Sequence, residues 1–300
     1  MTRSKEQTAD TIAMRARKAH IPTSTPPHSR DSGAASGSVA GRFDRLDALR
    51  GFALVWMAVF HFCFDLSTYR LLDANFYQDA LWTTQRTLIL SLFLLCAGAG
   101  QAVATSQGQS WARFGRRWAQ VLGCALLVSL GSWFMFPRSY ISFGVLHGMA
   151  VMLIVARVSA PLRGWLWPLG LLAVCLPQFI QHPFFDTRLT NWVGLVTHKP
   201  ITEDYVPVLP WLGVMWWGVA AGRWALVHRP QWLGAVDAPA TGPRRGLALL
   251  GRWSLSYYLL HQPVLLGLLT ALALPAQAAG RALSAFNLAI VGGVFVVQCA

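Results

Sequence analysis

Residues 45–66 read RLDALRGFALVWMAVFHFCFDL, and this stretch decides the class of fold. From Ala48 onward the run is almost continuously apolar, interrupted by Arg50 near its start and by His61 and Asp65 further along. The hydrocarbon core of a bilayer is about 30 Å thick and needs about 20 residues of α-helix to cross it. The run therefore predicts a membrane-spanning helix over residues 48–66.

Apolar runs of similar length recur along the rest of the chain. The predicted spans are 48–66, 87–105, 118–136, 141–158, 164–181, 206–224, 249–272 and 283–300. Continuous runs of this kind are not the short alternating segments that a membrane β-barrel requires. We therefore expect an all-α, polytopic transmembrane helix bundle of about eight spans, with seven to nine as the range.

The composition points to the same environment. Of the 300 residues, 54% are hydrophobic and 12% are charged, whereas a soluble domain carries about 25% charged residues. This balance argues against a soluble enzyme, a disordered protein and a disulfide scaffold. The five cysteines are isolated within apolar runs and no pair has metal-ligand spacing, so we expect small buried side chains and no metal site.

The formal charge of +13 is distributed unevenly over the predicted topology. With the N-terminus in the cytoplasm, the inner segments hold 17 Lys and Arg residues and the outer loops hold six. Positive residues accumulate in cytoplasmic loops, so both ends of the chain are predicted to be cytoplasmic. Because the basic residues lack the pattern of a nucleic-acid module, we expect no nucleic-acid partner.

The first 41 residues differ in composition from the rest. They are rich in Ser, Thr, Pro, Gly and Ala, with basic residues scattered among them. Such a segment buries too little apolar surface to offset the entropy of ordering it. We expect a disordered basic tail over 1–41 and a single transmembrane domain over 42–300.

The helix predicted over 48–66 carries three ionisable residues on one face. Arg50 and His61 are eleven residues apart, which places them on one stripe about 16 Å apart along the helix axis. Asp65 follows His61 at i+4 and shares that stripe. Ionisable side chains within a bilayer are candidates for function, although an interface anchor, an interfacial histidine and a helix-end carboxylate are the structural alternatives.

These three residue types suit group transfer. An arginine binds phosphate groups through bidentate contacts, as a phosphate-bearing donor requires. A histidine removes a proton from an amine or hydroxyl, and a neighbouring carboxylate orients its ring. We therefore interpret His61 and Asp65 as candidate catalytic residues and Arg50 as a candidate donor-binding residue.

The segment LDALRGFA (46–53) followed by His61 resembles the first helix of integral membrane acyltransferases. Its spacing matches the Arg-x10-His pattern of acyltransferase family 3. From about residue 43 to 295, the chain is still more similar to bacterial relatives of the heparan-α-glucosaminide N-acetyltransferase catalytic domain. The supporting stretches are FLLCAGAG (93–100), FGVLHG (143–148), VLPWLG (208–213) and GRWSLSYYLLHQP (251–263).

This resemblance implies acetyl-CoA as a co-substrate bound from the cytoplasm, and no permanently bound cofactor. It implies a glycan or a small amine or hydroxyl acceptor on the periplasmic side of the bacterial inner membrane. His61 then corresponds to the essential histidine and Arg50 to the arginine of the motif. The chain departs from the heparan enzyme in having no histidine at 66–86, where that enzyme carries its catalytic histidine after the first helix.

Other polar residues are weaker candidates for a functional role. Arg138 is expected in the short outer loop at 137–140, and His147 one to two turns into the span over 141–158. Both are candidates for acceptor binding, with interhelical packing as the alternative for His147. His261 precedes Pro263, and we interpret it as part of a helix kink. Asp204 is expected in a solvated outer loop, with binding of a cationic or hydroxylated acceptor as the alternative.

Two other classes of function remain open. A transporter or a permease for a lipid-linked substrate could use the same polar residues as a proton or substrate pathway, although the sequence lacks clear inverted repeats. A non-catalytic membrane scaffold would need none of them. The sequence leaves the oligomeric state open, a homodimer included.

Overall fold

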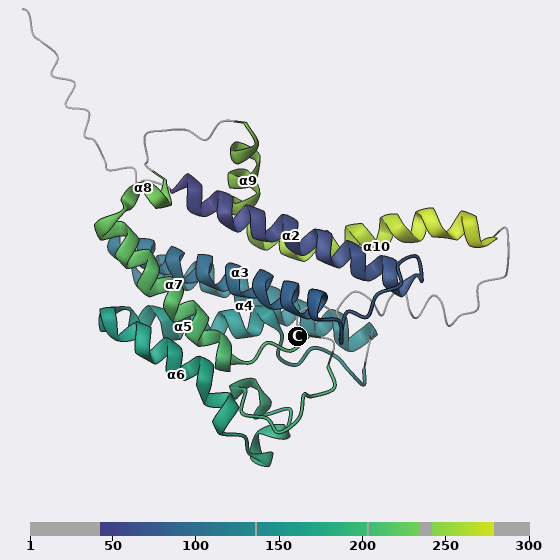
Figure 1. The fold of residues 1–300 in the computed structure, drawn as a ribbon, viewed down its shortest axis with the longest axis horizontal. Helices are drawn as coiled ribbons and strands as arrows, with labels where there is room; N and C mark the ends of the chain where they lie inside the picture. Colours follow the sequence, from purple (N-terminus) through teal and green to yellow (C-terminus); the bar gives the residue numbers. More distant parts are fainter. Residues whose placement is uncertain (1–42, 136, 203, 235–241, 279–300) are drawn as a thin grey trace, which may run out of the picture. The chain divides into compact units, whose positions relative to one another are not determined.

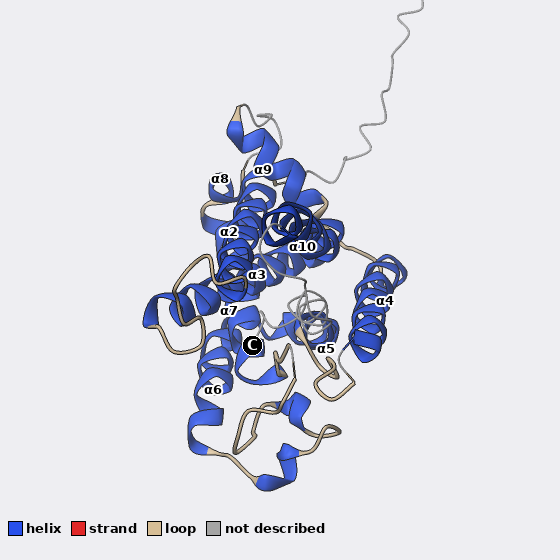
Figure 2. Ribbon diagram, turned by 90° about the vertical axis from the view of Figure 1, so that its right-hand side faces the viewer, coloured by secondary structure: helices blue, strands red, loops and turns tan. Residues whose placement is uncertain are grey.

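A computed structural model describes residues 43–135, 137–202, 204–234 and 242–278 of the chain. The predicted tail (1–41) and the last predicted span (283–300) lie outside these residues. Every regular element in the described part is helical, as Figure 2 shows, which confirms the all-α class.

Long helices account for most of the described chain. They are α2 (Asp44–Thr68), α3 (Ala80–Ser106), α4 (Trp111–Met135), α5 (Val145–Ser159), α6 (Leu166–Phe179), α7 (Val208–His228) and α10 (Ser254–Ala278). The shorter helices are α8 (Pro230–Leu233) and α9 (Pro243–Arg252). Pro243 occupies the first turn of α9, where its missing N–H removes no helical hydrogen bond.

Among the described residues, three helical stretches are long and apolar enough to cross a membrane by length and composition. They are Asp44–Thr68, Ala80–Ser106 and Val145–Phe179. The third stretch contains α5, a six-residue 3-10 segment and α6, so it includes parts of two predicted spans. These helices indicate a membrane protein, and the number of spans and the orientation remain predictions.

Helices α2, α3 and α10 lie side by side, as Figures 1 and 2 show. The first two are antiparallel, because Arg50 approaches Cys96 while Trp56, further along α2, donates to Gln85 near the start of α3. Helix α10 runs parallel to α2. The opposite side of α3 packs on α7, and a core of fully buried side chains such as Leu94 and Met215 fills this interface.

The predicted span over 249–272 is wrong as one uninterrupted helix. The structure ends α9 at Arg252 and begins α10 at Ser254. Two glycines explain the position of α9, because a methyl group on Gly51 would overlap the Leu247 carbonyl and one on Gly251 would overlap the Asp47 carbonyl. The backbones of α2 and α9 therefore meet directly, and α10 leaves this contact along α2.

Candidate active site between α2 and α10

The predicted stripe of α2 faces other helices in the structure. The side chain of His61 is buried with the residue 5% exposed, and Asp65 is fully buried. Arg50 is half-buried against α3. The costly ionisable groups are thus inside the helix bundle, where charged and polar side chains of membrane proteins carry out function.

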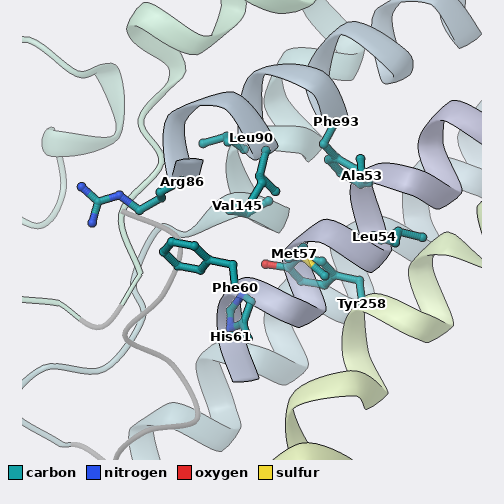
Figure 3. A pocket seen from close by; sticks show the side chains of 11 residues that line it. Ala53, Leu54, Met57, Phe60, His61, Arg86, Leu90, Phe93, Val145 and Tyr258 are labelled. Atoms are coloured by element: carbon teal, nitrogen blue, oxygen red, sulfur yellow. The ribbon is translucent and has the colours of Figure 1, made fainter. Parts of the chain in front are cut away.

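His61 lines a cavity of about 40 Å³ between α2, α3 and α10, shown in Figure 3. The lining residues are Ala53, Leu54, Met57, Phe60, His61, Arg86, Ile89, Leu90, Phe93, Val145 and Tyr258. Apart from His61, Arg86 and Tyr258, the lining is apolar. A space of this size holds about one water molecule, so the imidazole has almost no solvent around it.

A second histidine lies against the first. The ring centroids of His61 and His261 are 4.9 Å apart, and the rings meet edge to face at 83°. His261 is itself buried, at 9% exposure. The sequence assigned His261 to a kink, and only the parallel packing of α10 on α2 brings it to His61.

The carboxylate of Asp65 has a different partner from the one expected. We predicted that it orients His61, but in the structure it accepts two hydrogen bonds from Nε2 of Gln262, at 3.0 and 3.2 Å. Gln262 follows His261 on α10, so this bond joins α10 to α2 beside the two histidines.

Arg50 belongs to a polar cluster at the other end of α2. Its guanidinium donates to Asp47 at 3.2 Å and to the Cys96 carbonyl at 3.4 Å. Arg252 of α9 reaches the same Asp47 at 3.7 Å and also pairs with Asp44 at 2.7 Å. Arg50 is absent from the lining of the His61 cavity, so the two ends of the predicted stripe share a helix face but not one open cavity in this structure.

The structure does not bring Arg138 or His147 to this cavity. His147 is held at both ring nitrogens, because Nδ1 accepts the Gly144 N–H at 3.3 Å and Nε2 lies 3.1 Å from the Ser129 hydroxyl. The ring therefore connects the start of α5 to α4, as expected if His147 serves interhelical packing and not acceptor binding. Arg138 is exposed in the preceding loop.

Asp204 is buried, although the sequence placed it in a solvated loop. One carboxylate oxygen accepts the N–H of Val145 at 2.7 Å and so caps the start of α5, and the other is buried without a partner among the described residues. Burial raises the pKa of this carboxyl to about 7, against the opposing effects of the Val145 hydrogen bond and the Lys199 charge. Because Val145 also lines the His61 cavity, Asp204 fixes one wall of it.

Residues 42–263 match the family model for the catalytic domain of heparan-alpha-glucosaminide N-acetyltransferase. The chain belongs to this family. The match includes the α2 stripe and ends just after His261 and Gln262, so both sides of the histidine contact lie within the heparan-alpha-glucosaminide N-acetyltransferase catalytic region. Membership implies an acetyltransferase-type membrane enzyme. No curated protein and no solved structure matches the chain.

Proposed function

We propose that the protein is a membrane acetyltransferase that moves an acetyl group from cytoplasmic acetyl-CoA to an amine or hydroxyl acceptor at the periplasmic side of a bacterial inner membrane. The observation that carries this proposal is the buried imidazole of His61, which lines an apolar cavity on the same face of α2 as Arg50. Family membership supplies the class of chemistry.

His61 acts on the acceptor. A neutral imidazole takes a proton from an amine or hydroxyl as that group attacks the thioester carbonyl. The apolar lining favours this step, because a cavity with room for about one water molecule protects an activated acyl group from hydrolysis. Side chains around the cavity must move apart to admit the acetyl group and the acceptor.

Arg50 acts on the donor. Its guanidinium is partly exposed at the end of α2 where Arg252 of α9 pairs with Asp44, and the positive residues of the chain concentrate in the predicted cytoplasmic segments. Phosphate groups of CoA would take up guanidinium donors that now bond to Asp47 and to the Cys96 carbonyl. The donor chain would then extend along α2 toward His61, about 16 Å away.

A sided assay tests this proposal. The purified protein is reconstituted in liposomes with radiolabelled acetyl-CoA on one side and glucosamine on the other. We expect N-acetylglucosamine to appear on the glucosamine side only when the predicted cytoplasmic face meets acetyl-CoA. Uptake of glucosamine without acetylation would support a transporter, and the absence of both transfer and CoA binding would support a scaffold.

A further inference from the structure

Two ring nitrogens beside the cavity are buried without a hydrogen-bond partner among the described residues. They are Nδ1 of His61 and Nε2 of His261. Buried polar atoms in folded proteins are nearly always bonded, so each unpaired atom calls for an explanation. Here the two atoms belong to rings that contact each other.

The protonation of His261 follows from its other nitrogen. Nδ1 lies 2.8 Å from the Tyr258 carbonyl and 3.3 Å from the Tyr257 carbonyl of the preceding turn. A carbonyl oxygen only accepts, so Nδ1 carries the hydrogen. In the neutral ring Nε2 is then a free lone pair, which can accept a proton.

His147 shows what a purely structural histidine looks like in this chain. Both of its ring nitrogens have partners, and they join α5 to α4. His261 bonds through Nδ1 to carbonyls of its own helix and leaves Nε2 without a partner among the described residues. This difference separates His261 from a histidine that only packs.

We propose that His261 is the proton relay partner of His61, a role that rests on the proposed acetyltransferase function. As the acceptor attacks the thioester carbonyl, its proton passes to Nε2 of His61 and the Nδ1 proton of His61 passes to Nε2 of His261. The new bond joins the acceptor atom to the acyl carbon, and the carbon–sulfur bond breaks to release CoA as its thiolate. The thiolate then takes the Nε2 proton of His61, and the Nε2 proton of His261 returns to Nδ1 of His61, which restores both rings to their starting neutral forms.

Neighbouring contacts hold the two rings in position. The bond from Gln262 to Asp65 fixes α10 on α2 one residue from His261 and one helical turn from His61. The Tyr257 ring stacks on His261 with a centroid distance of 5.9 Å and an interplanar angle of 11°. The relay requires one of the two imidazoles to turn so that the unpaired nitrogens come within hydrogen-bond distance.

The variant His261→Asn tests the relay. The asparagine amide N–H can replace Nδ1 as the donor to the Tyr258 carbonyl, but it offers no basic nitrogen. With acetyl-CoA and glucosamine as substrates, we expect kcat to fall about 10²-fold while KM for acetyl-CoA stays within twofold of the wild type. His198→Asn, which changes an exposed histidine, is the control and should leave both constants unchanged.

A proton inventory on the wild-type protein makes the test independent of folding. In mixtures of H₂O and D₂O, a relay that moves two protons predicts a curved dependence of kcat on the deuterium fraction. A linear dependence, or a His261→Asn variant with wild-type kcat, would overturn the relay while leaving the acetyltransferase proposal intact. A wild-type protein that transfers no acetyl group would overturn both.

Discussion

Gln262 of α10 donates from its amide nitrogen to both carboxylate oxygens of Asp65 on α2, and neither residue is exposed to solvent. This bond is a buried polar connection between the two helices that carry the histidine pair. It stabilises the packing of the two helices, because a buried carboxylate that loses its hydrogen-bond donor is left with the full free-energy cost of its desolvation.

Replacing Gln262 with alanine should therefore destabilise the bundle. We expect a loss of about 1–3 kcal/mol in the free energy of unfolding, which is the usual effect of leaving a buried polar group without a partner. Thermal unfolding in detergent micelles measures it. The double variant Asp65→Leu/Gln262→Leu should recover part of the loss, and equal stability of Gln262→Ala and wild type would show that the bond does not join the helices.

A second prediction follows from the direct backbone contact of α2 with α9. Gly51→Ala should destabilise the protein, because the added methyl group overlaps the Leu247 carbonyl and forces the two helices apart. Gly115→Ala is the matched control, since nothing lies within 4 Å of the corresponding position on α4. Alanine favours a helix over glycine by about 1 kcal/mol, so the control should be neutral or stabilised.

Asp204 makes the stability of the protein depend on pH. Burial raises its pKa in the folded state from 3.8 to about 7, so between these values the folded protein binds more protons than the unfolded chain. The contribution of Asp204 to stability should thus decrease as the pH rises from about 4 to about 7. Asp204→Asn keeps an oxygen for the Val145 N–H and removes the charge, so its unfolding temperature should fall less over this range than that of the wild type. Parallel curves for the two proteins would contradict the assignment.

A substitution of Arg50 should weaken the binding of the acetyl donor more than the binding of the acceptor. Arg50→Lys keeps the charge and loses the forked geometry that binds phosphate, so we expect KM for acetyl-CoA to rise about tenfold with little change in KM for glucosamine. Arg113→Lys, at an exposed position of α4, should change neither constant. If Arg50→Lys raised KM for glucosamine more than KM for acetyl-CoA, Arg50 would not be part of the donor site.

Hydropathy alone predicts most of the helices. The apolar runs predict α2 to α7 with displaced ends, because burial in lipid or in protein requires long apolar helices. The break at Trp253 was not predictable, since the run over 249–272 is apolar on both sides of it and the break follows from the contact of Gly51 with α9.

The candidate site could be predicted only where it lies on one helix. The spacing of Arg50 and His61 places both on one face of α2. The contact of His61 with His261 and the bond from Gln262 to Asp65 join residues about 200 positions apart. Such pairs depend on which helix packs beside α2, and a single hydropathy pattern does not specify that choice.

The central claim is that His61 is the group that activates the acceptor. Its most direct test is the rate of acetyl transfer from acetyl-CoA to glucosamine by purified wild type and His61→Ala, with equal unfolding temperatures confirming that both are folded. The account predicts transfer by the wild type and a rate at background in the variant, while acetyl-CoA binding is retained. Wild-type turnover in His61→Ala would contradict it.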